Sequence, residues 1–141
     1  RQDSVQAGLK EVDVDTRIVV VHDGARPCVT SEMGSEIATA VKRSGAVTFG
    51  RKITDTVKRV EKGITVSKTE DRDKLWAVQT PQAFQMKILR AAYKALGKSE
   101  VTDDCHAVEL SGESVKIIEN RLPNFKITTV EDLQIAGALL K

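Results

Sequence analysis

Apolar residues recur along this chain at two spacings, which alternate from one segment to the next. Spacings of three and four residues, together with capping residues, predict helices that begin near Ser4, Thr30, Pro81, Thr102 and Thr128. Short β-branched or apolar runs predict strands at 17–22, 46–49, 75–78 and 114–118. The first two runs do not alternate with polar residues, which is typical of strands covered on both faces. The chain is therefore expected to be an α/β domain with a mainly parallel sheet and flanking helices.

Capping residues and apolar faces define these helices further. Thr30 or Ser31 is expected to cap the second helix, whose apolar face carries Met33, Ile37 and Val41. Gly97 is expected to end the third helix. Thr102 is expected to cap the fourth, and Thr128 with Glu131 to form a capping box on the last. The apolar face predicted for that last helix consists of Val130, Leu133, Ala136 and Leu140.

Residues 51–79 differ from the rest of the chain in their pattern of polar and apolar residues. Segments 51–60 and 64–69 alternate loosely between apolar and polar residues, and Gly63 lies in the turn between them. This pattern predicts a β-hairpin with few apolar side chains to bury. An isolated two-stranded hairpin is marginally stable in water, so the arm is expected to lie against another surface, such as a second subunit.

Composition restricts the class of protein. The 141 residues are enough for one domain, and 40% hydrophobic with 30% charged residues is typical of a globular chain. The net charge of +2 and the lack of an aromatic stacking platform argue against nucleic-acid binding. The apolar run 18–21 is too short to cross a membrane, and no secretion leader is recognisable. Cys28 and Cys105 show no CxxC spacing, which favours a reducing, cytoplasmic setting.

The first residues are unusual for a complete protein. The chain has no initiator Met and enters an apolar-periodic segment almost at once, at Val5. We therefore expect the chain to be truncated at its N-terminus.

Polar side chains follow several of the predicted strands. In an open parallel sheet, ligands bind beyond the carboxyl ends of the strands. The candidates there are Asp23 with Arg26, Thr56, Thr80, and Asn124 with Lys126. Arginine and lysine bind phosphate oxygens, whereas aspartate accepts from hydroxyl groups or binds a divalent metal. An Asp-Gly turn can equally be an ordinary loop.

Other polar residues have simpler interpretations from spacing alone. Residues 71–73 fit a solvated turn, and 102–104 fit a helix cap. His22 and His106 lack partners at metal-ligand spacing. No Walker loop, GxGxxG or Ser-His-Asp arrangement is present.

Six motifs occur in a fixed order and span nearly the whole chain. They are RQDSV at 1–5, VHDGARP at 21–27, TDTVK at 54–58, QTPQ at 79–82, TDD at 102–104 and NFKIT at 124–128. In this combination the sequence closely resembles the 2-C-methyl-D-erythritol 4-phosphate (MEP) cytidylyltransferases of the non-mevalonate isoprenoid pathway. These are Rossmann-like nucleotidyltransferases that join MEP to CTP, with Mg²⁺, giving CDP-methylerythritol and pyrophosphate. The family's N-terminal strand and Gly-rich loop, which hold a catalytic arginine and lysine, have no counterpart in this sequence.

The resemblance implies a role for each matching position. The nucleotide would be bound by Ser4, Gly24 and Lys126, of which Lys126 would also be catalytic. MEP would be bound by Asp23, Arg26, Thr80 and Thr102, and by Thr56 and Arg72 from the β-arm of a partner in a homodimer. Mg²⁺ would be held mainly through the nucleotide phosphates. The compartment would be the cytoplasm, or the plastid stroma in a plant.

Two alternatives stay open. A sister cytidylyltransferase acts on ribitol 5-phosphate and shares the fold and arm, although the stretches at 23–27 and 54–58 look more like the MEP enzyme. The chain could also be a catalytically silent fragment that dimerises through residues 51–79. Because the cationic loop is missing, we expect little or no activity from the chain as it stands.

Overall fold

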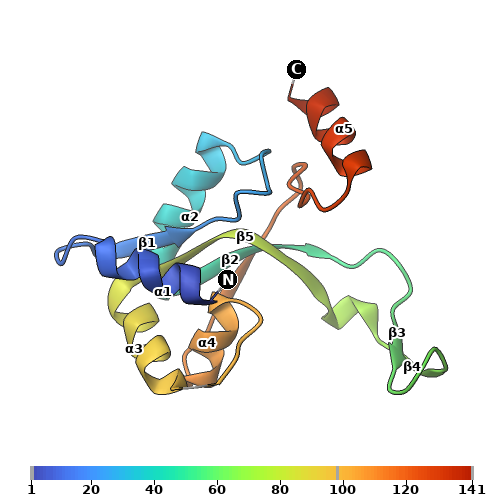
Figure 1. Ribbon diagram of the computed structural model, residues 1–141, viewed down its shortest axis with the longest axis horizontal. Coiled ribbons are helices and arrows are strands. Elements are labelled where there is room, and N and C mark those ends of the chain that lie inside the picture. Colours follow the sequence, from blue (N-terminus) through green and yellow to red (C-terminus); the bar gives the residue numbers. More distant parts are fainter. Residues whose placement is uncertain (1, 98, 141) are drawn as a thin grey trace.

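A four-stranded sheet separates two layers of helices in the computed structural model, which describes residues 2–97 and 99–140 (Figure 1). Arg1, in the first of the six motifs, lies outside the described residues. The strands lie in the order β1-β5-β2-β6. Their bounds are Ile18–Val21 for β1, Ala46–Lys52 for β2, Trp76–Gln85 for β5 and Lys116–Glu119 for β6.

The sheet is mixed. β2 and β6 pair in parallel, whereas β5 pairs antiparallel with both β1 and β2. β1, β2 and β6 therefore run in the same direction, with the reversed β5 between β1 and β2. The α/β architecture is confirmed, and the expectation of a mainly parallel sheet is corrected to three codirectional strands with an antiparallel strand among them.

Strand β5 also extends further than the sequence predicted. The sequence predicted a helix beginning near Pro81, but β5 continues through this position, and helix α3 begins only at Met86 (Met86–Leu96). In the register with β2, Thr48 pairs with Gln82 and Phe49 with Gln79, so Thr80 and Pro81 form a bulge. Proline cannot donate to a β-ladder, and a bulge is one of the few places where a strand accepts it.

Each face of the sheet has its own core. Helix α2 (Ser31–Ser44) buries Met33, Ile37 and Val41 against Val47, Phe49 and Ala83. Helices α1 (Gln2–Glu11), α3 and α4 (Asp104–Leu110) cover the other face and pack with Ala46 and Phe84. Neighbouring residues of a strand point to opposite faces, so Ala83 and Phe84 belong to different cores. The apolar face predicted for α2 is confirmed, and so is its Thr30 cap.

The caps of the last two helices lie one residue later than predicted. Asp103, not Thr102, caps α4 by accepting from the backbone N–H of His106. The capping box of helix α5 (Val130–Leu139) is formed by Thr129 and Asp132. Among the described residues of α5 only Ala136 is buried, so its predicted apolar face does not pack on the sheet. In Figure 1, α5 lies apart from the helices of both layers.

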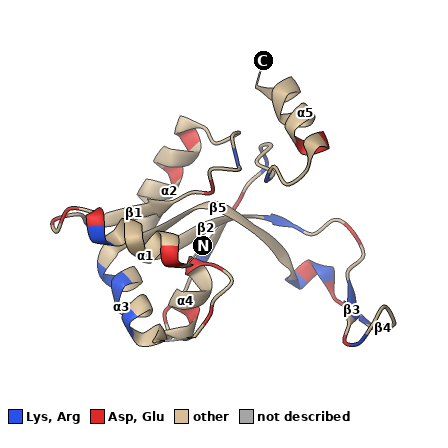
Figure 2. Ribbon diagram, viewed as in Figure 1, with Lys and Arg blue, Asp and Glu red and all other residues tan. Residues whose placement is uncertain are grey.

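The hairpin predicted within residues 51–79 is present and projects from the sheet (Figure 1), although 51–52 belong to β2 and 76–79 to β5. It contains β3 (Lys58–Val60), β4 (Val66–Thr69) and a 3-10 turn, η1 (Arg72–Lys74). Both signs of charge occur along it (Figure 2). Arg59 and Lys68 both pair with the carboxylate of Glu70, and these bonds lower its pKa. The side chain of Ile64 at its tip is 97% exposed.

No helix in the described part of the chain is long and apolar enough to cross a membrane.

Candidate active site

Two loops meet beside the bulge of β5, at the carboxyl ends of the codirectional strands β1 and β6. The loop after β1 makes a tight turn, in which the N–H of Arg26 donates to the carbonyl of Asp23 (3.0 Å). The loop after β6 joins it, because the N–H of Ile127 donates to the carbonyl of Ala25 (2.8 Å). The arrangement agrees with the rule that ligand sites form at this end of a sheet.

The carboxylate of Asp23 lies between two cations. Its Oδ2 is 3.4 Å from Nε of Arg26 and 3.5 Å from Nζ of Lys126. Arg26 also donates from Nη1 to the carbonyl of Asn124 (2.7 Å), which fixes its guanidinium against the second loop. The Lys126 side chain is 47% exposed, against 12% for Arg26. One carboxylate and two cations leave a local excess of positive charge, which favours phosphate binding.

Thr80 connects these loops to the sheet. Its Oγ1 accepts from the backbone N–H of Asp23 (2.9 Å) and lies 3.0 Å from Nδ1 of His22. Its carbonyl accepts from Nδ2 of Asn124 (2.8 Å). Thr80 is only 3% exposed, and its hydroxyl and its carbonyl are both engaged within the chain. Its predicted contact with a substrate stays a prediction, and the geometry gives it a supporting role in addition.

A buried amide network underlies the second loop. Oε1 of Gln79 accepts from Nδ2 of Asn120 (2.8 Å) and, more weakly, from Nδ2 of Asn124 (3.4 Å). All three side chains are buried. Buried polar groups require such partners, so the network fixes how the chain passes from β6 toward Lys126. Sequence reasoning missed the roles of Gln79 and His22, because both hydrogen-bond to residues far away in sequence.

The structure brings together four of the predicted site residues, namely Asp23, Arg26, Thr80 and Lys126. Gly24 lies in the same turn, but it is not one of the glycines with positive φ. A Cβ added at Gly24 would meet nothing within 4 Å. The turn therefore does not rely on a backbone conformation that only glycine adopts readily.

The other predicted residues lie elsewhere. Ser4 is exposed on α1, and Thr102 precedes α4 beside His106. Thr56 and Arg72 are exposed on the arm, where Arg72 donates to the carbonyl of Thr54. Thr56 follows the end of β2 and lies in the segment that leads into β3 of the arm. Their proposed contacts with a partner's ligand stay predictions.

The structure also describes the side chains that metal or thiol chemistry would use. Among the described residues, no group of three or more His, Cys, Asp or Glu side chains could hold a metal ion. That Mg²⁺ would be held mainly through the nucleotide phosphates, as the family resemblance implies, stays a prediction. Burial and the nearby carboxylate of Asp103 raise the pKa of the Cys105 thiol far above its usual range. A thiol held protonated is a poor nucleophile.

The mixed sheet between two helical layers, with a cationic cluster at its strand ends, defines a Rossmann-like nucleotidyltransferase fold. The whole chain, residues 1–141, matches the family model described as "IspD: 2-C-methyl-D-erythritol 4-phosphate cytidylyltransferase". The chain belongs to this family.

Named relatives agree with that assignment. Proteins named 2-C-methyl-D-erythritol 4-phosphate cytidylyltransferase from Alkaliphilus oremlandii and Syntrophus aciditrophicus are 43% and 44% identical over 143 residues. The alignments cover all of this chain and 61% of each relative. The crystal structure of the 4-diphosphocytidyl-2C-methyl-D-erythritol synthase from Anaerococcus prevotii aligns with a TM-score of 0.89 at 36% identity, covering 99% of this chain and 66% of that one. The crystal structure of the 2-C-methyl-D-erythritol 4-phosphate cytidylyltransferase from Thermus thermophilus aligns with a TM-score of 0.88 at 33% identity. That alignment covers 99% of this chain and 68% of the Thermus thermophilus chain.

The chain thus spans about three fifths of the length of the curated relatives that it matches.

Proposed function

We propose that this chain is part of a cytidylyltransferase that joins MEP to CTP and releases pyrophosphate, and that it carries residues that bind MEP and residues that bind the nucleotide. The observation that carries the proposal is the cluster of Asp23, Arg26 and Lys126, formed by motifs that match the family. A nucleotide and a sugar phosphate repel each other, so a catalyst for their union must supply positive charge at the point of contact.

The reaction needs alignment more than it needs a base. The phosphate of MEP is already an anionic nucleophile, and one of its oxygens forms a bond to the α-phosphorus of CTP. The bond from that phosphorus to the bridging oxygen of the β-phosphate breaks, and pyrophosphate leaves with the electron pair. Holding two reactants in line contributes about 7 kcal/mol or more in favourable cases. Bound Mg²⁺ would supply further neutralisation of the triphosphate charge.

In this scheme, each group of the cluster has a separate task. Lys126, the more exposed cation, is assigned to the nucleotide phosphates, with Ser4 and Gly24 near the cytidine. Arg26 and Asp23 are assigned to MEP, the first as a cation and the second as an acceptor for its hydroxyl groups. Thr80 and Thr102 would complete that pocket.

The β-arm is proposed to complete the site of a second subunit. Its exposed apolar residues Val60, Ile64 and Val66 offer a surface for a partner, and the hairpin has no core of its own. Thr56 and Arg72 would then reach the phosphate of the partner's MEP. Sedimentation velocity measures the assembly directly: a dimer is expected, and a monomer at all concentrations would contradict this part of the proposal.

The activity is tested by turnover of CTP with MEP or ribitol 5-phosphate and Mg²⁺, using the longest natural polypeptide that contains this chain. Pyrophosphate release with MEP is expected, and a preference for ribitol 5-phosphate would favour the sister enzyme. The chain by itself is titrated with CTP and Mg²⁺ by calorimetry. Micromolar binding would contradict the alternative that it is a silent dimerising fragment.

The arm assignment has its own test. Arg72→Ala is expected to raise the KM for MEP about tenfold or more, since a charge-assisted hydrogen bond contributes about 1.5–3 kcal/mol. The KM for CTP should stay nearly constant. Lys74→Ala is the matched control, because Lys74 lies in the same turn and pairs only with the exposed Asp71 among the described residues. An effect of Arg72→Ala confined to CTP would refute the assignment.

A further inference from the structure

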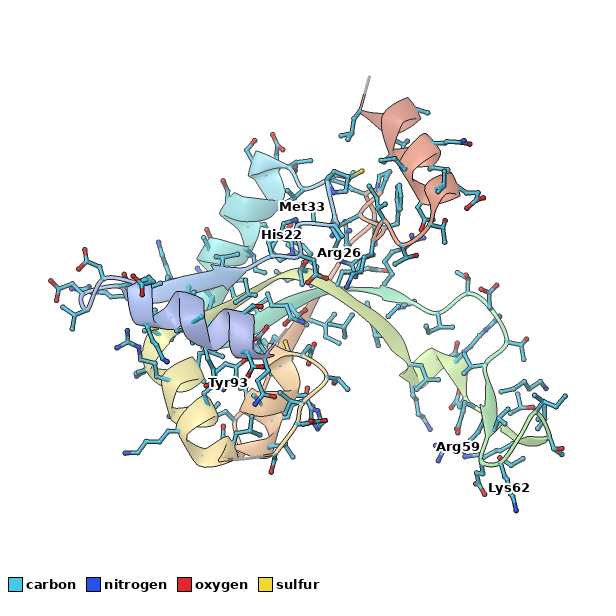
Figure 3. The ribbon with its side chains drawn as sticks, viewed as in Figure 1. His22, Arg26, Met33, Arg59, Lys62 and Tyr93 are labelled. Atoms are coloured by element: carbon cyan, nitrogen blue, oxygen red, sulfur yellow. The ribbon has the colours of Figure 1, made fainter. Side chains whose placement is uncertain are left out.

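The imidazole of His22 bridges the turn that carries Asp23 and Arg26 and residue Thr80 of β5. Its Nε2 lies 2.9 Å from the carbonyl oxygen of Arg26, and its Nδ1 lies 3.0 Å from Oγ1 of Thr80. His22 and Arg26 lie close together at this end of the sheet (Figure 3). The ring therefore joins the turn to the bulge of β5.

The partners of the ring determine where its proton lies. A carbonyl oxygen only accepts hydrogen bonds, so Nε2 must carry a hydrogen and donate to Arg26. At Nδ1, one hydrogen must lie between the nitrogen and Oγ1 of Thr80, because two lone pairs at 3.0 Å would repel each other. That hydrogen comes either from Thr80 or from a doubly protonated, cationic ring.

The surroundings of Thr80 decide between these two states. Its Oγ1 already accepts from the N–H of Asp23. If a cationic His22 also donated to Oγ1, the hydroxyl hydrogen of Thr80 would need another acceptor. No other acceptor contacts Oγ1 among the described residues, and Thr80 is almost fully buried. Burying an unsatisfied donor is unfavourable, so the neutral ring gives the complete network.

We infer that His22, as the neutral Nε2–H tautomer, is a positioning residue that makes Thr80 donate to Nδ1 and thereby locks the turn carrying Asp23 and Arg26. Hydrogen bonds then run in one direction, from the N–H of Asp23 to Thr80 and from Thr80 to His22, with a separate bond from His22 to the Arg26 carbonyl. A Thr80 hydroxyl committed in this way does not donate to a ligand phosphate. Phosphate recognition is left to the cations, and only this last consequence rests on the proposed function.

Nitrogen NMR of the labelled chain reads the tautomer without any substrate. The long-range proton–nitrogen spectrum of His22 is expected to show a protonated Nε2 and an unprotonated Nδ1 at pH 7.5. The chain has two histidines, so His106→Gln assigns the signals. A ring protonated at Nδ1, a cationic ring or a mixture of tautomers would overturn the inference.

Two variants at position 80 test the coupling. Thr80→Val keeps the shape but removes the hydroxyl, so the Nδ1 signal of His22 and the amide signal of Asp23 should both shift. Thr80→Ser retains the hydroxyl and should restore both signals, whereas the signals of His106 should not respond to either change. Unchanged His22 and Asp23 signals in a folded Thr80→Val chain would overturn the inference. If Thr80→Val does not fold, the tautomer in the unaltered chain decides.

Kinetics separates this inference from the proposed function. In an active polypeptide, His22→Phe is expected to raise the KM for MEP about tenfold, with kcat/KM recovered in part by His22→Gln, which can still donate. Absence of any turnover in the unaltered protein would reject the proposed function, and the NMR result would still decide the role of His22. Equal activity of His22→Phe and the unaltered protein would overturn the positioning role.

Discussion

Replacing Asn124 with aspartate should destabilise the chain in a strongly pH-dependent way. The side chain is fully buried, and its Nδ2 donates to the carbonyl of Thr80 at 2.8 Å and faces Oε1 of Gln79 at 3.4 Å. Both partners are acceptors, so the network itself assigns nitrogen to this position of the amide. Asn124→Asp keeps the size but places a carboxylate oxygen against two acceptor oxygens.

The size of the effect follows from these contacts. Asn124→Ala leaves a buried carbonyl without its donor, which costs about 1–3 kcal/mol. An unpaired buried charge is worse, and breaking a buried charged contact costs about 3–5 kcal/mol. The free energy of unfolding of Asn124→Asp at pH 7.5 should therefore fall below that of Asn124→Ala, although aspartate fills the space better.

The pH dependence has a defined sign. Burial and the two facing acceptors favour the neutral carboxyl, so its pKa in the folded chain would lie above the unfolded value of about 3.9. Well below the unfolded value of about 3.9 the carboxyl is protonated in both states and can donate to Thr80, so the loss of stability is smallest there. As the pH rises, the unfolded state ionises first and the destabilisation grows.

Urea unfolding followed by circular dichroism, at pH 4.5 and pH 7.5, measures this difference. Gln134→Glu is the control, because it makes the same chemical change at an exposed position of α5. Its stability should stay within about 0.5 kcal/mol of the unaltered chain. If Asn124→Asp were as stable as the unaltered chain at pH 7.5, the assignment of Nδ2 as the donor, and with it the support of the Lys126 loop, would be wrong.

Three further changes test separate features. Gly45→Ala should lower the free energy of unfolding, measured by urea titration, by more than about 1 kcal/mol. The reason is that φ is +82° at this position and a Cβ would lie 2.6 Å from Cδ1 of Ile88. Gly24→Ala is the control and should lower the free energy of unfolding less, because an added Cβ would meet open space there. Cys105 should react with a thiol reagent far more slowly in the native chain than in urea, because its raised pKa keeps the thiol protonated. Fast labelling of Cys105 in the native chain would contradict this prediction. Hydrogen bonds from Thr128 and Thr129 lower the pKa of Asp132, so this carboxylate stabilises the fold above its unfolded pKa and loses that effect as pH falls through the folded value. The gap in melting temperature between Asp132→Ala and the unaltered chain should thus be present at pH 7 and shrink in acid.

The sequence by itself determined the features that depend on neighbouring residues. The apolar face of α2 and its cap by Thr30 follow from spacings of a few residues, and so does the polar hairpin with Gly63 in its turn. The ordered motifs also indicated the family, which the match over residues 1–141 confirmed.

Only the tertiary structure decided how distant segments combine. Pro81 looked like a helix start, yet the pairing of β5 with β2 made it part of a bulge. Thr80 and Lys126 are dozens of residues from Asp23, and the contacts of Asp23 with each of them depend on strand order and register, which local propensities do not encode. The tertiary structure also decided that the Thr80 hydroxyl donates to His22. The direction of that hydrogen bond depends on all the partners around the hydroxyl, and the fold brings these partners together.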